Sequence, residues 1–244
     1  MIEEQKNGGS RYLRPKHLTI KEIREGCRYV EGSDNIETRI CAINEEFRQG
    51  FEVLAEHKEH TKSVTFWGSA RLRDGDKYYE IAERLAKKIG SFGYTIVTGG
   101  GPGIMEAGNK GAVEAGAHSI GATIALPFEQ VTNPYVKEEI PFYFFFTRKV
   151  ILAYSAEVYL YFPGGFGTFD ELFEILTLIQ TGKIQRVPVI LVGSEFWKPF
   201  DDVIRSEMLE KHKTIDEKDL ALYRILDDEE AILDIVHKAS LREE

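Results

Sequence analysis

Cysteine, long apolar runs and blocks of basic residues are all scarce in this sequence. Cys27 and Cys41 are the only cysteines among 244 residues, too few for a disulfide framework and consistent with a reducing compartment. No apolar run approaches the roughly 20 residues that span a membrane, and the polar first residues, MIEEQK, are unlike a signal peptide. We therefore expect a soluble, cytoplasmic protein with no membrane partner.

The charge balance is acidic, with a formal net charge of −9. The absence of a Lys/Arg block argues against a nucleic-acid partner, so a small anionic substrate has to be captured by a few local groups. The hydrophobic content of 43% allows a sizeable core. We divide the chain into a polar tail and helical extension at residues 1–60 and one catalytic domain at residues 61–244.

The extension begins with a polar stretch, residues 1–16, for which we expect no fixed structure. From residue 19 to residue 60, apolar side chains recur at helical spacing and predict two or more helices that pack on the rest of the protein. These side chains are Ile20, Ile23, Tyr29, Ile40, Ile43, Phe47, Phe51 and Leu54.

The catalytic domain alternates strand-like and helix-like segments. Strands are predicted at residues 64–67, 94–97, 119–124, 142–146, 157–162 and 188–192. This alternation predicts an α/β protein with a Rossmann-like, doubly wound, mostly parallel sheet and helices on both faces. Ligands bind beyond the carboxyl ends of such strands. Three of those ends are polar or rich in glycine, at residues 68–70, 99–103 and 164–168.

The most informative segment is the turn PGGFGTFDE at residues 163–171, which joins the strand 157–162 to an amphipathic helix. Its three glycines are expected to allow positive φ and close backbone approach. The helix start presents unpaired N–H groups and the positive end of the macrodipole, which together bind phosphate.

Several cofactor classes are disfavoured by the same loops. The first strand is not followed by GxGxxG, which disfavours NAD, and the absence of GxxxxGK[ST] disfavours a P-loop kinase or ATPase. A pyridoxal-dependent decarboxylase is disfavoured because the chain is short and its glycine loops identify no Schiff-base lysine. We expect no cofactor. Taken alone, the loop 99–103 is also explained by a tight turn needed for packing.

Three motifs carry a family resemblance. They are PGGFGTFDE, which fits PGGxGTxxE; GGGPGIME at residues 99–106; and Thr147-Arg148-Lys149. With these motifs the chain resembles the LOG family of nucleoside 5′-monophosphate phosphoribohydrolases from about residue 64 to residue 202. Plant-type members have Met-His-x-Arg-Lys where this chain has FFTRK, so it looks like the longer bacterial branch. The resemblance implies a homo-oligomer, at least a dimer.

Arg148 and Lys149 are expected in the first turn of a helix at residues 148–154, with Thr147 as its N-cap. Cations there oppose the macrodipole and cost a few tenths of a kcal/mol, which favours an anionic ligand beside them. The alternative is that they face solvent or pair with an acidic neighbour. The resemblance favours Arg148 as a catalytic residue that holds phosphate or assists the leaving base.

Glu171 has two explanations. Thr168 and Glu171 fit a capping box, in which the glutamate bonds the N-cap N–H and has no chemical role. The resemblance instead places the catalytic glutamate at Glu171, with Glu174 one turn further on to orient it. Asp170 is expected to be a surface residue.

The implied reaction is hydrolysis of the N-glycosidic bond of a nucleoside 5′-monophosphate, such as AMP or a cytokinin riboside monophosphate. Positive charge develops on the ribose during cleavage, and the Glu171 carboxylate would stabilise it as nucleophile, base or electrostatic partner. The alternative is a carrier resembling the molybdenum cofactor carriers, which needs no such glutamate. The residues assigned to substrate binding are Gly68, Ser69, Gly100, Gly101, Gly103, Met105, Lys149, Gly164, Gly165, Phe166, Gly167, Thr168, Glu174 and Thr177.

Two further features are given structural interpretations. His57 and His60 are spaced to share a metal ion, but no third ligand is evident nearby, so we expect surface histidines and no metal. The aromatic run at residues 142–146 is interpreted as a buried strand or a subunit contact.

Overall fold

The structure is a computed structural model that describes residues 21–22, 36–58, 61–126 and 131–242. These residues form one sheet of seven parallel strands in the order β4-β3-β2-β1-β5-β6-β7. The strands are β1 (Ser63–Trp67), β2 (Thr95–Thr98), β3 (Ser119–Ile124), β4 (Glu138–Phe142), β5 (Val158–Tyr161), β6 (Val189–Val192) and β7 (Arg224–Leu226). Every residue of β1, β2, β5 and β6 is buried, as expected of strands covered on both faces.

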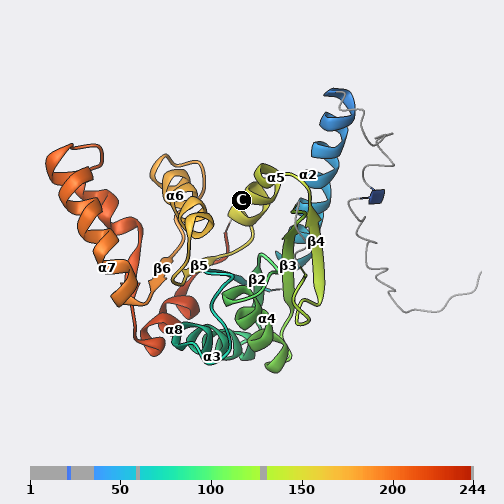
Figure 1. The fold of residues 1–244 in the computed structure, drawn as a ribbon, viewed down its shortest axis with the longest axis horizontal. Coiled ribbons are helices and arrows are strands. Elements are labelled where there is room, and N and C mark those ends of the chain that lie inside the picture. Colours follow the sequence, from blue (N-terminus) through green and yellow to red (C-terminus); the bar gives the residue numbers. More distant parts are fainter. Residues whose placement is uncertain (1–20, 23–35, 59–60, 127–130, 243–244) are drawn as a thin grey trace, which may run out of the picture.

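Helices lie on both faces of this sheet (Figure 1). One face carries α3 (Lys77–Ser91), α4 (Ile104–Glu114) and α8 (Glu229–Lys238), and the other carries α5 (Phe145–Ala153), α6 (Phe166–Gln180) and α7 (Ser194–Val203). Alternate strand residues supply the two cores: Phe66 stacks on Phe162 on the first side, and Trp67 stacks on Tyr161 on the second. The predicted Rossmann-like, doubly wound fold is confirmed.

The aromatic run is where the predicted strand is wrong. β4 ends at Phe142, and Phe145 already begins α5. β4 escaped detection because its sequence, EEIPF, has two glutamates and a proline, which edge strands tolerate. Phe142 is buried, whereas Phe145 and Phe146 are 55% and 50% exposed.

Beyond β6 the chain contains elements that the sequence pattern did not predict. They are α7, a π-helix (Ile204–Lys211), a 3-10 helix (Glu217–Leu222), β7 and α8. β7 extends the sheet by pairing with β6, and α8 covers the face that also carries α3. β7 lies at the β6 edge of the sheet, away from β2, β3 and β4.

The helical extension is described in its second half, where α2 (Ile36–Lys58) packs Val53 and Leu54 into the core. Ile20, Ile23 and Tyr29 lie outside the described residues. Cys41, on α2, is disulfide-bonded, and Cys27 lies outside the described residues. In the part of the chain that the structure describes, no helix has the length and apolar character needed to cross a membrane.

Candidate active site

The loops after β1, β2 and β5 meet at the centre of the sheet. β1 lies between β2 and β5, so the strand order reverses beside β1, and ligands bind doubly wound folds at such a point. The Ser69 N–H donates to the Pro163 carbonyl at 3.0 Å, and the Ile104 N–H donates to the Ser69 carbonyl at 3.0 Å. The three strand ends predicted to form the site are therefore joined by backbone hydrogen bonds.

The loop after β2 is rich in glycine because its neighbours leave no room for side chains. Gly103 has a φ of 75°, and a Cβ there would lie 2.3 Å from the Ser69 carbonyl oxygen. A Cβ on Gly99 would lie 2.2 Å from Arg148 Nη2 and 2.7 Å from Met105 Sδ. The missing side chain of Gly99 thus lets Arg148 reach the loop, and Met105 lies beside it.

Two buried asparagines that the sequence analysis missed support this loop. Asn133 Nδ2 donates to the carbonyls of Gly100 at 3.1 Å and Gly101 at 2.9 Å, and to Asn109 Oδ1 at 2.9 Å. Asn109 Oδ1 also accepts from the Thr98 hydroxyl at 2.6 Å. Buried amides of this kind fix a loop because each of their groups would otherwise be left without a hydrogen bond. The sequence signal that could have identified Asn109 is its position on the buried, apolar face of α4.

The loop after β5 differs from the prediction, because Gly164, Gly165 and Gly167 all lack positive φ. Gly164 is required by close approach instead, since a Cβ there would lie 2.0 Å from Thr168 Oγ1. A Cβ on Gly165 or Gly167 would meet nothing within 4 Å, and Phe166 between them is 97% exposed. The start of α6 therefore offers bare backbone N–H groups to an anion.

The capping-box interpretation of Glu171 is wrong. The N-cap of α6 is Gly165, and no side chain caps the helix. Thr168 and Glu171 are the third and sixth residues within the helix, so Glu171 lies too far along α6 to bond the N-cap N–H. This position leaves the carboxyl free of a capping role.

Glu171 is a buried carboxyl with an altered acidity. Its side chain is on the buried face of α6, and the residue is 6% exposed. Burial raises its pKa to about 7, although the nearby charge of Arg148 lowers it; Glu174 raises it further. Among the described residues, no group donates a hydrogen bond to this carboxylate. Desolvation therefore outweighs the attraction of the arginine, and Glu171 titrates near neutral pH.

Arg148 approaches the same region from α5. It is buried, its Nε donates to the Ala122 carbonyl at 2.7 Å, and its Nη2 lies 3.5 Å from the Gly99 carbonyl oxygen. Burial lowers the pKa of Arg148, and the charge of Glu171 raises it. The predicted helix start is wrong by three residues: α5 begins at Phe145, so Arg148 is its fourth residue and Thr147 is not the N-cap.

The start of α5 is capped from another helix. The N-cap, Phe144, has no side-chain cap, and Glu46 on α2 supplies the carboxylate instead. Glu46 accepts from the N–H groups of Tyr143 at 2.8 Å and Phe144 at 3.4 Å and from the Thr147 hydroxyl. Thr147, which donates to Glu46, directly precedes Arg148, so this cap also fixes the backbone beside the arginine. Local sequence signals could not identify Glu46 as the cap, because it lies 101 residues from Thr147.

Lys149 follows the alternative given for it, pairing with acidic neighbours. Its Nζ lies 2.9 Å from Asp170 and 3.3 Å from Glu174 on α6. Asp170 is a surface residue as expected, with a side chain that is 58% exposed, and it also forms an ion pair with Lys149. Burial raises the pKa of Glu174 and Lys149 lowers it. These ion pairs hold α5 and α6 together on either side of Glu171.

Two further residues, Gly68 and Thr177, were assigned to substrate binding. Gly68 lies at the meeting of the loops, where a Cβ would lie 2.7 Å from the Ile104 side chain. Thr177 lies apart, exposed on α6 beyond Glu174, and lines a cavity of about 90 Å³ with Phe173 and Ile204. Its assignment to substrate binding stays a prediction.

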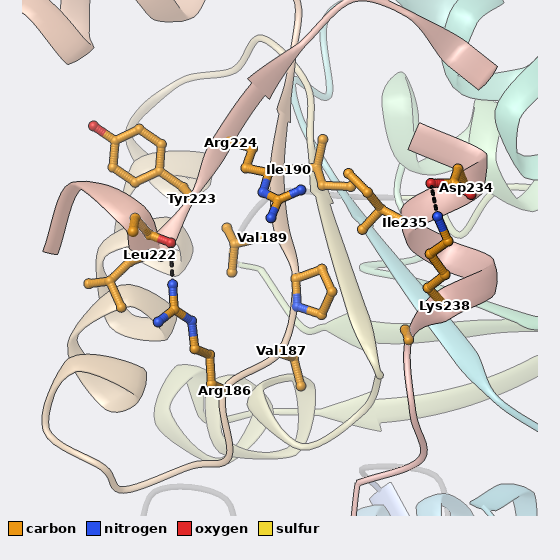
Figure 2. A pocket seen from close by; sticks show the side chains of 13 residues that line it. Arg186, Val187, Val189, Ile190, Leu222, Tyr223, Arg224, Asp234, Ile235 and Lys238 are labelled. Atoms are coloured by element: carbon orange, nitrogen blue, oxygen red, sulfur yellow. Dashed lines mark hydrogen bonds and ion pairs between the residues drawn. The ribbon is translucent and has the colours of Figure 1, made fainter. Parts of the chain in front are cut away.

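A larger cavity, of about 430 Å³, lies at the opposite edge of the sheet, between the amino ends of β6 and β7 and the end of α8 (Figure 2). It is lined by Val187, Val189, Ile235 and several charged side chains, of which Arg186 already donates to the Ala221 carbonyl. None of the predicted site residues lines this cavity. Size alone therefore does not locate the chemistry.

A family model described as "Possible lysine decarboxylase" matches residues 105–236, which include Arg148 and Glu171. A cytokinin riboside 5′-monophosphate phosphoribohydrolase of Rhodococcoides fascians is 27% identical over 65% of this chain and 81% of that protein. The chain belongs to the LOG family. The cytokinin riboside 5′-monophosphate phosphoribohydrolase LOG of rice (Oryza sativa subsp. japonica) is 33% identical over 55% of this chain and 56% of its own length.

Three further proteins are similar to this chain in sequence or in fold. A pyrimidine/purine nucleotide 5′-monophosphate nucleosidase of Escherichia coli is 29% identical over 60% of this chain, which spans only 35% of that protein. A molybdenum cofactor binding protein of Rippkaea orientalis has a TM-score of 0.55 at 20% identity, covering 73% of this chain and 96% of that one. A Moco carrier protein of Chlamydomonas reinhardtii has a TM-score of 0.51 at 24% identity, over 73% and 99% of the two chains. These two structures share the fold.

Proposed function

We propose that this protein hydrolyses the N-glycosidic bond of a nucleoside 5′-monophosphate to the free base and ribose 5-phosphate. The observation that carries the proposal is Glu171, a buried carboxyl with a pKa raised to about 7 beside the charge of Arg148 and the open start of α6. A raised carboxyl pKa in such a position is typical of catalytic sites. The activities for which the similar proteins are named support the same reaction.

In the proposed mechanism, the 5′-phosphate binds the N–H groups at the start of α6, over the open space beside Gly165 and Gly167. The ribose then lies towards Glu171, further along the helix. As the bond to the base breaks, positive charge develops on C1′ and O4′, and the Glu171 carboxylate stabilises it and activates water. Arg148 holds the phosphate or the departing base.

The proposed substrates are purine nucleoside 5′-monophosphates, with AMP and cytokinin riboside 5′-monophosphate as the first candidates. The names of the relatives cover both a cytokinin nucleotide and general pyrimidine and purine nucleotides. A site made of backbone N–H groups binds the 5′-phosphate, which all of these nucleotides have in common.

The test is incubation of the full chain with AMP and a panel of other monophosphates, followed by chromatography for base and ribose 5-phosphate. We expect base release in the wild type and none in Glu171→Gln. Tight nucleotide binding without release would instead favour the carrier alternative, which needs no Glu171. If the protein neither binds nor cleaves any monophosphate, the proposal fails.

We also propose a homodimer, formed through an apolar surface on α2 and α5. Ile36 and Ile40 on α2 are 67% and 50% exposed, and Tyr143, Phe145 and Phe146 are between 45% and 55% exposed. α2 and α5 pack against each other, and exposed apolar side chains on neighbouring elements are typical of an interaction surface. Light scattering should give at least twice the chain mass of 27.8 kDa, and a monomer at micromolar concentration would contradict the proposal.

A further inference from the structure

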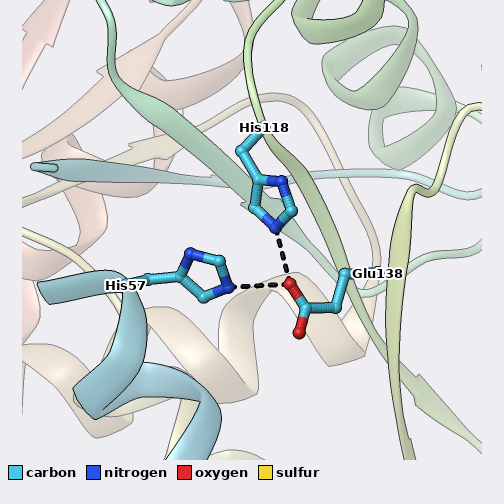
Figure 3. A group of neighbouring side chains, drawn as sticks. All are labelled: His57, His118 and Glu138. Carbon is cyan, nitrogen blue, oxygen red and sulfur yellow. Dashed lines mark hydrogen bonds and ion pairs between the residues drawn. The ribbon is translucent and has the colours of Figure 1, made fainter. Parts of the chain in front are cut away.

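Two histidines and a glutamate converge at the edge of the sheet opposite the candidate active site. His57 lies in the last turn of α2, His118 directly precedes β3, and Glu138 is the first residue of β4. Their side chains point towards one another (Figure 3): Nε2 of His57 lies 2.7 Å from Glu138 Oε2, and Nε2 of His118 lies 2.6 Å from the same oxygen. Three separate chain segments thus direct one ligand atom each to a common point.

The register of the sheet shows that this cluster is separate from the proposed chemistry. Ile120 of β3 is opposite Glu138 of β4, so His118 and Glu138 mark the amino ends of two parallel strands. Arg148 follows the carboxyl end of β4, and Glu171 follows the carboxyl end of β5. The hydrolysis proposed above therefore gives these three residues no role.

The cluster is sheltered and remains within reach of small ions. The side chains of His57, His118 and Glu138 are 22%, 30% and 15% exposed. The two imidazole rings stack with their centroids 4.4 Å apart, and the ligand atoms all lie within 4.8 Å of one another. The expectation that His57 is an ordinary surface histidine is therefore wrong. His60, which is spaced in sequence to share a metal ion with His57, lies outside the described residues.

We propose that His57, His118 and Glu138 bind a divalent transition-metal ion of the zinc type. Two neutral imidazoles and one carboxylate are the ligands that zinc takes in proteins, whereas magnesium and calcium prefer oxygen ligands. Without a cation, both imidazoles have to present an N–H to one carboxylate oxygen. With one, both Nε2 lone pairs and the carboxylate face the same positive charge.

The geometry needs only a small adjustment to hold the ion. Zinc lies about 2.0–2.1 Å from nitrogen and oxygen ligands, which in a tetrahedral site places the ligand atoms about 3.3 Å apart. The present Nε2 to Oε2 separations of 2.7 and 2.6 Å have to widen by about 0.6 to 0.7 Å, which a rotation of the Glu138 side chain supplies. A water molecule completes the tetrahedron.

The structure also indicates what the ion does. It joins the end of α2 to the amino ends of β3 and β4, and α2 carries Glu46, which caps α5 beside Arg148. The ion therefore clamps the helical extension onto the sheet. Because it lies away from the reacting bond, its removal should lower the temperature of unfolding and leave the chemical step largely intact.

The experiment uses the full chain, treated with a chelator and then titrated with zinc chloride in a calorimeter. We expect one zinc ion per chain, at least tenfold weaker binding in His57→Ala, His118→Ala and Glu138→Gln, and no binding of magnesium. His212→Ala is the matched control, because this exposed histidine pairs with Glu207 outside the cluster. Zinc should raise the unfolding temperature of the wild type and of the control, but not of the three variants.

Cobalt keeps the proposal testable if a variant does not fold. Cobalt chloride added to the wild-type protein should give the visible absorption of a tetrahedral site with nitrogen and oxygen ligands, and zinc should displace it. Absence of zinc binding by the wild type at micromolar concentration would overturn the proposal. So would unchanged affinity in all three variants, or equal binding of magnesium.

Discussion

Glu46 and Glu171 are both buried carboxylic acids near the start of a helix, and burial raises the pKa of each. Glu46 accepts hydrogen bonds from two backbone N–H groups and a hydroxyl at the start of α5. Glu171 accepts none among the described residues, and Arg148 affects it only through its charge. Both carboxyl groups are thus buried beside a helix, but within the described part of the chain only Glu46 has hydrogen-bond donors.

The difference separates a structural carboxylate from a reactive one. At Glu46 the hydrogen bonds and the helix dipole stabilise the charged form and offset part of its desolvation. At Glu171 the desolvation is offset only by neighbouring charge, so the group retains unused acceptor capacity that a substrate or water can fill. The comparison predicts that changes at Glu171 act on catalysis and on the pH dependence of stability, whereas changes at Glu46 act mainly on stability at any pH near neutral.

The largest expected effect is that of Glu171→Gln on turnover. Glutamine preserves the size of the side chain but removes the negative charge that opposes the developing cation, so kcat should fall about 100-fold or more. Steady-state kinetics of base release from AMP measure it. Glu195→Gln serves as control, since that carboxylate is 82% exposed. A fully active Glu171→Gln enzyme would end the catalytic assignment.

Arg148→Ala should have the next largest effect, a loss of roughly 10- to 100-fold in kcat/KM, because it removes a charged donor beside Glu171. A raised KM alone would assign Arg148 to the phosphate, and a lowered kcat would assign it to the leaving base. Lys149→Met is the informative partner, because Lys149 is already paired with Asp170 and Glu174. Equal losses in both variants would contradict the distinction between these cations.

The acidity of Glu171 should appear in the stability of the protein. Its pKa is about 7 in the folded protein against an ordinary 4.5, so folding favours the protonated form. This contribution is complete below pH 4.5 and is lost as the pH rises through about 7. Between pH 5.5 and 7.5, the wild type should lose about 2 kcal/mol of unfolding free energy relative to Glu171→Gln. Denaturant titrations at the two pH values measure this, and a constant difference would contradict the raised pKa.

The smallest expected effect is that of Glu46→Gln, which should lower the free energy of unfolding by about 1 kcal/mol, the usual cost of weakening a helix cap. Turnover should change much less than in Glu171→Gln. Glu45→Gln is the matched control, because Glu45 is the neighbouring residue on α2 and pairs with Arg48. If Glu46→Gln abolished turnover without loss of stability, the comparison between the two carboxylates would be wrong.

The sequence determined the elements whose signals are local. Apolar runs predicted β1, β2, β3, β5 and β6 to within a few residues, because strands buried on both faces need continuous apolar side chains. The glycine loops and the three family motifs located the meeting point of strand ends and its candidate residues. Helix starts were less certain, as at Thr147 and Thr168, because several residues in each turn satisfy the same capping rule.

Only the tertiary structure decided which distant groups meet. Glu46 and Thr147 are separated by 101 residues, and His57 and Glu138 by 81, and nothing in either local sequence names the other. The pKa of Glu171 likewise depends on burial and on Arg148 from another helix. Local patterns record what a segment needs in order to form, whereas desolvation and long-range pairing exist only once the segments have packed together.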